Sequence, residues 1–255
     1  MELSVDFESS AQKNAGEYYK TAQKLEKKLA GLEKAMAALE DRYDGIERTI
    51  VAEKKKLVVR KEQKWYEKFN WFYTSEGFLV IGGRDAHQNE LVNSRYFNEG
   101  DLFFHADIHG GSVTVLVEGE KAHKASKEEA AQFAGCHSSA WQSMLKGVDV
   151  YSLRRGQISK STEKGSLGTG SFLMKGEREW YRSVKLELIA FVQDEMLNVV
   201  PSSTFGEKKG ETNHVTIAQG EMKKSDAAKS VSKRLGFGEL DLIMRMLPSG
   251  TFMVR

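Results

Sequence analysis

Apolar side chains near the start of the chain recur in steps of three and four residues, the spacing of one narrow helix face. The positions are Tyr18, Ala22, Leu25, Leu29, Leu32, Met36 and Leu39. After an interruption at 41–45 (DRYDG), a lysine-rich run continues with Ile46, Ile50, Leu57 and Phe69. The pattern favours an antiparallel helical hairpin, a coiled coil, over 9–69. The alternative is one continuous helix that tolerates Gly45 at a cost of about 1 kcal/mol.

Beyond residue 69 the helical spacing gives way to short runs typical of strands. They are FNWFYT, GFLVIG, DLFFHAD, SVTVLVEG, VDVYSL, GSFLMKG and LELIAFV. Residues 126–145 predict a helix, with Ser126 as its N-cap and Glu129 as the capping-box partner. We therefore expect a mixed α+β domain over 70–205.

The last part of the chain predicts a small α+β module over 213–255. A charged segment without apolar residues, GEKKGET at 206–212, looks like a linker. The strands NHVTIAQ and TFMVR flank two predicted helices, with Ser225 as an N-cap and Gly236 as a C-terminal stop. The predicted fold class is α+β: the helical hairpin, the mixed domain and this module.

Composition narrows the function classes. The 255 residues are 40% hydrophobic and 29% charged, with a net charge of +2, so the total charge alone does not indicate a nucleic-acid binder. Cys136 is the single cysteine, which excludes a disulfide within the chain and favours a cytoplasmic location. No apolar run is long enough for a membrane span, and the first residues do not resemble a signal peptide.

Polar residues cluster directly after the predicted strand GFLVIG, in the sequence GGRDAHQNE. Asp85 and Gln88 have the spacing of a helix cap. That interpretation does not account for Arg84, His87 or Asn89. The helix amides and Arg84 could also bind a phosphate. The pattern leaves two alternatives open: a cap alone, or a cap that also presents a polar binding site.

The sequence HADIHG places His105, Asp107 and His109 at alternate positions. On one strand they would share a face and suit Zn²⁺ or Fe²⁺, which would give a metal-dependent hydrolase. The two glycines that follow indicate that the strand ends early, in which case the three side chains would not share a face. In the alternative interpretation, the histidines shape a turn or touch a polar ligand, and no metal or cofactor is expected.

A basic segment at 151–180 intersperses cations with glycine, serine and threonine. The cations are Arg154, Arg155, Lys160, Lys164, Lys175 and Arg178. Such a loop can follow a phosphate backbone, and Trp180 and Tyr181 could stack on bases. A solvated basic hairpin is the alternative. The chain has no G-x-S-x-G, HExxH or CxxC motif, so we expect no enzyme.

Five motifs in order resemble the NFACT-R domain, also called DUF814. They are WYEKFNWFYTSEGFLVIGGRDAHQNE, GDLFFHADIHGGSVTVLV, SAW, GQISKS and TGSFLMKG. This domain belongs to the ribosome quality-control family of RqcH and nuclear export mediator factor, which older labels call fibronectin-binding. The start of the chain resembles part of the same family's middle coiled coil.

The resemblance implies binding rather than catalysis. Family members engage the large ribosomal subunit that carries a stalled nascent chain and help to recruit tRNA. The expected partners are tRNA, large-subunit RNA and, through the coiled coil, ribosomal proteins; the coil also permits a homodimer. A pure coiled-coil interaction module is the alternative. The expected RNA-binding residues are Arg84, His87, Asn89, His105, His109, Arg154, Arg155, Lys160, Lys175 and Arg178.

The chain departs from the family pattern in one large respect. The family's NFACT-N domain, with its Asp-Arg pair, and its helix-hairpin-helix region have no counterpart in this sequence, and Arg84-Asp85 is a different motif. We therefore expect a fragment of a longer protein or a reduced member, which does not support C-terminal tailing alone.

Overall fold

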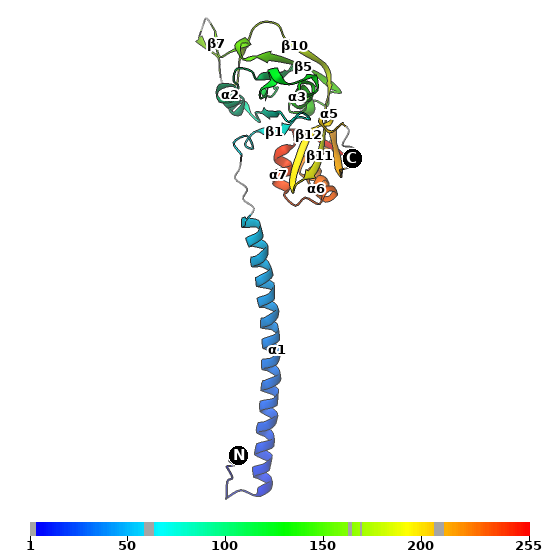
Figure 1. Cartoon of the computed structure of the whole chain (residues 1–255). Coiled ribbons are helices and arrows are strands. Elements are labelled where there is room, and N and C mark those ends of the chain that lie inside the picture. Colours follow the sequence, from blue (N-terminus) through cyan, green and yellow to red (C-terminus); the bar gives the residue numbers. More distant parts are fainter. Residues whose placement is uncertain (1–3, 59–63, 163–164, 169, 207–211) are drawn as a thin grey trace. The chain divides into compact units, whose positions relative to one another are not determined.

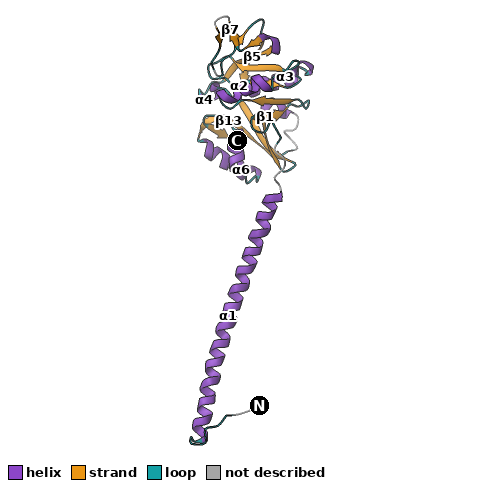
Figure 2. Cartoon of the chain, turned by 90° about the vertical axis from the view of Figure 1, so that its left-hand side faces the viewer, coloured by secondary structure: helices purple, strands orange, loops and turns teal. Residues whose placement is uncertain are grey.

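The computed structural model describes residues 4–58, 64–162, 165–168, 170–206 and 212–255. The chain divides into two compact units, 1–63 and 64–255. The second unit contains two antiparallel sheets with helices on their faces, so the predicted α+β class is confirmed (Figures 1 and 2).

The first unit consists of one helix, α1 (Ala11–Val58), with a short segment before it. The predicted hairpin is wrong, because the helix passes through DRYDG without a break. Gly45 costs a helix only about 1 kcal/mol, and the surrounding Ala, Leu, Glu, Lys and Arg are strong helix formers. Most of the predicted apolar stripe is exposed, with Leu25, Leu29, Leu32 and Met36 each about 60% accessible.

The first sheet of the second unit has the strand order β1-β2-β4-β3-β5-β10, with every neighbouring pair antiparallel. In chain order the strands are β1 (Asn70–Tyr73), β2 (Leu79–Gly82), β3 (Leu102–Ala106), β4 (Thr114–Leu116), β5 (Gly147–Arg154) and β10 (Glu179–Lys185). The last of these was not predicted, because the sequence EWYRSVK is mostly polar and lies at the edge of the sheet.

Between β5 and β10 the basic segment folds into short paired strands. They are β6 (Ile158–Ser159) with β9 (Leu173–Met174), and β7 (Ser161–Thr162) with β8 (Gly165–Ser166); η2 (Arg155–Gln157) precedes them. The predicted strand GSFLMKG thus corresponds to β9 only. Lys164 lies outside the described residues.

Both faces of the first sheet are covered, as alternation along β3 shows. Phe103 belongs to one buried cluster, with Ile81 and Val92, while Phe104 belongs to another, with Phe133. Val92 comes from α2 (Ala86–Arg95) and Phe133 from α3 (Lys124–Cys136). η1 (Gly119–Lys121) lies between β4 and α3.

The predicted helix at 126–145 is two helices, α3 and α4 (Ser139–Gln142). Ser126 is not the N-cap: it lies inside α3, is buried, and donates a hydrogen bond to Thr74 Oγ1 at 2.9 Å. Ser138 instead caps α4, where its hydroxyl accepts from Ala140 N. The break at His137 creates a corner between the two helices.

The second sheet has the antiparallel order β12-β11-β13-β14. Its strands are β11 (Glu187–Gln193), β12 (Met196–Pro201), β13 (His214–Met222) and β14 (Phe252–Val254). The helices that accompany it are α5 (Ser202–Phe205), α6 (Lys224–Leu235) and α7 (Leu240–Met246). Gly236 ends α6 in a left-handed conformation, as predicted, but α6 begins before Ser225.

The two sheets share one hydrophobic core. Trp141 of α4 is fully buried, and its indole N–H donates to Thr251 O at 3.2 Å beside β14. Gln219 of β13 donates to the carbonyls of Ala140 and Trp141. The same buried cluster contains Phe133 and Phe252, so the C-terminal strands and helices pack directly on α3 and α4. Most of the predicted linker, 207–211, is outside the described residues.

Candidate nucleic-acid interface

The turn after β2 is a helix cap, as the spacing predicted. The Asp85 carboxylate accepts a hydrogen bond from Gln88 N at 2.8 Å and so caps α2. Gln88 Oε1 reaches back and accepts from Arg84 N at 3.2 Å, one residue earlier than a standard capping box. The cap fixes the course of the chain at Arg84.

Asn89 has a structural role within the same turn. Its Oδ1 accepts from Val113 N at 3.0 Å, which ties α2 to the start of β4. A Cβ at Gly83 would lie 2.2 Å from that oxygen, so the close approach requires glycine at position 83. His87, by contrast, is exposed on α2.

Arg84 is half-buried, and its guanidinium is held by one backbone oxygen and one side-chain oxygen. Its Nη2 donates to Phe69 O at 2.7 Å and its Nε donates to Asn70 Oδ1 at 3.1 Å. Burial, followed by the positive charge of Arg245, lowers the pKa of the guanidinium, which still remains charged at neutral pH. Arg84 therefore faces the C-terminal helices rather than the basic segment at 151–180.

The histidines of HADIHG are not brought together. β3 ends at Ala106, and the His105 ring packs parallel to Phe103, 6.2 Å between centroids, where burial lowers its pKa. Asp107 and His109 are exposed beyond the strand. Across the described part of the chain, no group of three His, Cys, Asp or Glu residues has the geometry to hold a metal ion. The geometry gives a metal-dependent hydrolase no support.

Three cations of the basic segment contact other side chains of the same unit. Arg154 pairs with Glu120 at 3.2 Å, and Lys160 pairs with Glu90 while it also donates to Gly168 O. The Arg155 guanidinium lies 5.1 Å from the ring centre of Phe97. These contacts hold the segment against η1, α2 and the loop that follows α2. They also engage three of the cations that the sequence predicted to contact RNA.

Two exposed arginines and two aromatic rings lie together along β5 and the start of β10, and we call them the β10 cluster: Tyr151, Arg178, Trp180 and Arg182. The Tyr151 ring is buried, and Trp180 is half-buried. The Arg178 guanidinium is 4.4 Å from the Tyr151 ring centre, and that of Arg182 is 4.2 Å from the Trp180 ring centre. Arg182 also pairs with Asp149 at 2.6 Å. Sequence reasoning missed Arg182, although its alternation with Trp180 along a strand was a usable signal.

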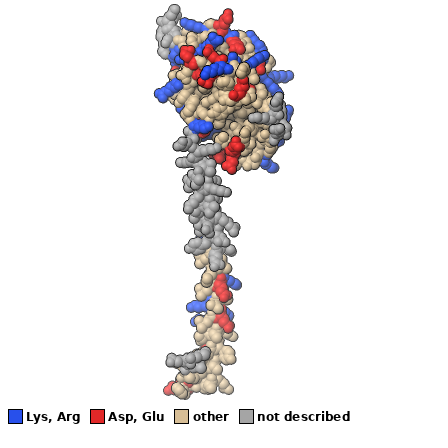
Figure 3. Space-filling model, viewed as in Figure 1, with Lys and Arg blue, Asp and Glu red and all other residues tan. Residues whose placement is uncertain are grey.

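The other predicted residues near this cluster divide between surface and core. Lys175 is exposed. Tyr181 points to the opposite face of the sheet and packs near Phe104, 5.6 Å between ring centroids. Only Trp180 of the predicted aromatic pair is therefore placed beside basic groups. On the face in Figure 3, Lys and Arg are interspersed with Asp and Glu over the second unit, as the small net charge suggested.

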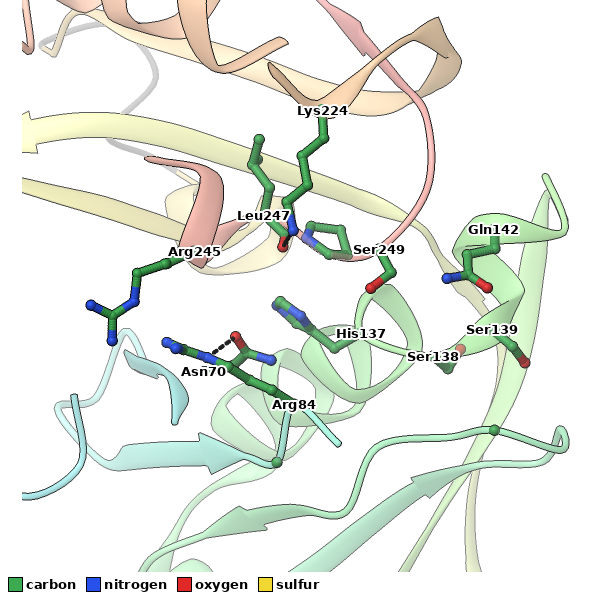
Figure 4. Close-up of a pocket in the computed structure, with 13 residues that line it drawn as sticks. Asn70, Arg84, His137, Ser138, Ser139, Gln142, Lys224, Arg245, Leu247 and Ser249 are labelled. Atoms are coloured by element: carbon green, nitrogen blue, oxygen red, sulfur yellow. Dashed lines mark hydrogen bonds between the residues drawn. The ribbon is translucent and has the colours of Figure 1, made fainter. Parts of the chain in front are cut away.

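Sequence reasoning also missed a polar pocket between the two sheets, which we call the cationic pocket. Its volume is about 330 Å³. It is lined by Asn70, Gly83, Arg84, Gly110, His137, Ser138, Ser139, Gln142, Lys224, Arg245, Leu247, Pro248 and Ser249. The lining comes from segments far apart in the sequence, so no local motif could reveal it (Figure 4).

Residues 68–176 match a family described as the NFACT protein RNA binding domain. The chain contains an NFACT-R domain. It is also homologous to ribosome quality control proteins. The archaeal Rqc2 homolog aRqcH of Methanocaldococcus jannaschii is 37% identical over 213 residues, which cover 80% of this chain and 31% of that protein. The ribosome quality control complex subunit NEMF homolog of Drosophila melanogaster is 34% identical over 73% of this chain and 19% of that protein.

The chain thus spans less than a third of the length of these relatives. Among solved structures, the C-terminal part of the fibronectin/fibrinogen-binding protein of Streptococcus suis matches with 23% identity and a TM-score of 0.41. That match covers 50% of this chain and 47% of the other. The described helices include none with the length and hydropathy of a membrane span.

Proposed function

We propose that the NFACT-R domain of this chain binds tRNA or large-subunit ribosomal RNA as part of a cytoplasmic ribosome quality control factor that acts on stalled nascent chains. The match of residues 68–176 to an RNA-binding family carries the proposal. The names of the homologues supply its setting, since they are ribosome quality control proteins. The role proposed is binding, without a reaction catalysed by this chain.

The β10 cluster and Lys175 are the proposed centre of the RNA contact. Arginine offers several N–H donors to phosphate oxygens, and a ring beside it offers a face on which a base can stack. Trp180 already has Arg178 and Arg182 near its ring, at 5.8 and 4.2 Å. A base and its phosphate would therefore meet both kinds of group within one surface.

The other predicted residues take supporting places in the proposal. Arg154, Arg155 and Lys160 shape the basic segment through their internal contacts and add to its positive potential. His87 and His109 are exposed for polar contacts, whereas His105 and Asn89 shape the fold beneath the surface. Arg84 lies in the cationic pocket. With Lys175 and Arg178, these eight make up the ten residues expected from the sequence.

The helix α1 is proposed to bind ribosomal proteins through its exposed apolar stripe, or to pair with a second copy of itself. Leucines spaced three and four apart are the usual seam of a helix pair. The division into 9–69, 70–205 and 213–255 remains a proposal as well, with the last two parts sharing one core.

A salt titration of tRNA binding tests the proposal on the full chain. The triple variant Lys175→Gln, Arg178→Gln and Arg182→Gln should bind labelled tRNA more weakly. Its plot of log affinity against log salt should be shallower by about 2 to 3, since each lost phosphate contact removes nearly one. The matched control neutralises three exposed cations of α6: Lys229, Lys233 and Arg234.

Equal salt slopes for the two triple variants would contradict the assignment of the β10 cluster. A further variant tests the alternative that the chain is a pure coiled-coil interaction module. Replacing Leu25 and Leu32 with Glu should leave tRNA affinity unchanged and remove self-association or protein binding through α1. Loss of tRNA affinity in that variant would instead place RNA binding on the helix.

A further inference from the structure

The cationic pocket collects positive charge from two sides. Arg84 follows β2 of the first sheet, while Lys224 begins α6 and Arg245 lies in the last turn of α7 beside the second sheet. Figure 4 shows these side chains converging on one space, with His137 between them. The lining contains neither Asp nor Glu. Three cations thus surround a concave site without an acidic counterpart on its walls.

These charges have no close carboxylate among the described residues. No ion pair within 4 Å is found there for Arg84, Lys224 or Arg245. In the 151–180 segment, by contrast, Arg154 and Lys160 each pair with a carboxylate, and Arg155 and Arg178 each lie beside an aromatic ring. The nearest acidic influence on Arg84 comes from Asp85, whose carboxylate is engaged as the cap of α2. Like charges therefore face each other: burial and then Arg84 lower the pKa of Lys224.

The donors of the pocket are positioned and still available. Arg84 uses two of its N–H groups, on Phe69 O and Asn70 Oδ1, and these bonds fix its orientation. Lys224 uses one, on Leu247 O at 2.9 Å. Guanidinium has five donors and ammonium three, so most remain for a ligand. Such preorganised groups lose little entropy when a ligand arrives.

His137 completes the set as a neutral group. It is half-buried at the corner between α3 and α4, and its ring lies 4.4 Å from that of Phe133. Burial, followed by the charges of Lys224 and Arg84, lowers its pKa to about 3, so the imidazole is uncharged at neutral pH. A neutral imidazole provides one N–H donor. A bound anion would offset the two cations and raise that pKa.

The pocket is accessible and larger than a single small anion. Arg245, Gln142 and Ser249 are exposed at its rim. A volume of about 330 Å³ lies at the lower end of the range typical of ligand sites. An anion at the centre would leave room for an attached group toward the rim.

From this geometry we infer that the cationic pocket binds a phosphate group, presented by RNA or by a free nucleotide, between Arg84, Lys224 and Arg245. Arginine binds phosphate through paired N–H groups, and lysine acts as a point charge. Phosphate has more acceptor oxygens than a carboxylate and can use donors from both walls at once. The RNA source rests on the proposed function, whereas the site itself does not.

Inorganic phosphate is the first probe, because it tests the pocket without RNA. Calorimetric titration of the full chain should show binding to the wild type and affinity weaker by about tenfold or more in Arg245→Gln, from loss of one charged donor. Lys233→Gln removes an exposed charge from α6 outside the pocket and should bind as the wild type does. In NMR spectra the ring protons of His137 should shift on titration.

Several results overturn the inference. They are no binding of phosphate by the wild type, equal weakening in Arg245→Gln and Lys233→Gln, and phosphate binding that leaves the His137 resonances unchanged. Arg245 is exposed, so its substitution should not unfold the protein, and Lys224→Gln serves as a second pocket variant. Both variants should bind phosphate more weakly if the pocket is the site.

A second arm identifies the source of the phosphate. If Arg245→Gln also weakens tRNA binding, and phosphate competes with tRNA, an RNA phosphate occupies the pocket. If tRNA affinity is unchanged while AMP and phosphate bind, the source is a free nucleotide, and the site still stands. If the β10-cluster variant loses tRNA binding and the wild type binds no phosphate, the inference about the pocket is wrong, while the proposed RNA-binding function stands.

Discussion

Two regions of the second unit carry clustered positive charge, and they differ in what surrounds the cations. At 151–182, Arg154, Lys160 and Arg182 each pair with a carboxylate. In the cationic pocket, Arg84 and Lys224 bond only to neutral oxygens within the described structure. In the first region the protein's own carboxylates offset the positive charge, whereas in the second the charge is left for a ligand to offset.

The comparison shows why charge along a sequence is an incomplete guide to a binding site. The basic segment looked most like a phosphate track, yet folding supplies Glu90, Glu120 and Asp149 from other elements. The pocket could not be recognised in the sequence, because Arg84 lies 140 or more positions before Lys224 and Arg245. Three substitutions test this contrast.

Gly83→Ala should have the largest effect on the free energy of unfolding, because it distorts the turn that positions Arg84. The new Cβ would lie 2.2 Å from Asn89 Oδ1 and 2.7 Å from Asn89 N, so α2 must move. Overpacking of this kind costs about 1–3 kcal/mol. Urea unfolding followed by tryptophan fluorescence measures it, since Trp65, Trp71, Trp141 and Trp180 all lie in the second unit.

Gly156→Ala is the matched control in the basic segment. A Cβ there would meet nothing within 4 Å, so the free energy of unfolding should change by about 0.5 kcal/mol or less. Equal effects at the two glycines would mean that the turn at Arg84 is no more constrained than the basic segment.

Glu90→Gln should have a smaller effect, on the side of the comparison where cations are paired. The carboxylate accepts from Lys160 Nζ and from Gly170 N at 3.1 Å, and both charged side chains are about 30% exposed. At this exposure the loss should be about 1 kcal/mol or less at pH 7. The control Glu128→Gln, whose partner Lys124 is 3.6 Å away on an exposed face, should lose less.

The pH dependence of Glu90→Gln has a defined sign. The hydrogen bond from Lys160, followed by that from Gly170, lowers the pKa of Glu90 below its usual value of 4.5. A lowered pKa contributes stability above the unfolded-state value, and that contribution is lost as pH falls through the folded-state value. The difference between wild type and variant should therefore shrink in acid. A difference that is the same at pH 7 and in strong acid would contradict the pairing.

Local patterns predicted local structure well and distant contacts poorly. The Asp85 cap, the end of α6 at Gly236 and most strands followed from short-range spacing. The hairpin failed because a single glycine is too weak a signal to break a helix of strong helix formers. The capping role of Ser126 failed because tertiary partners, Thr74 and Glu76, took its hydroxyl.

The candidate site divides in the same way. Cations and Trp180 of the basic segment could be predicted, because they are adjacent in the sequence. Their carboxylate partners come from α2, η1 and β5, and the packing of His105 against Tyr151 depends on the strand order, which places β3 beside β5. The cationic pocket depends further on the second sheet packing against α3 and α4, which no local spacing encodes.

Arg245→Gln should have the smallest effect on stability and the opposite sign. Arg245 is exposed, and its charge opposes that of Arg84, so removing it should stabilise the free protein by about 0.5 kcal/mol or less at low ionic strength. High salt should erase the gain, because exposed charges are screened. Phosphate should reverse it, since only the wild type retains the full pocket and ligands stabilise the state that binds them. Urea unfolding in phosphate-free buffer, with Arg234→Gln as control, measures the difference. A loss of stability in Arg245→Gln under those conditions would mean that the pocket is already neutralised from within, and the contrast between the two cationic regions would disappear.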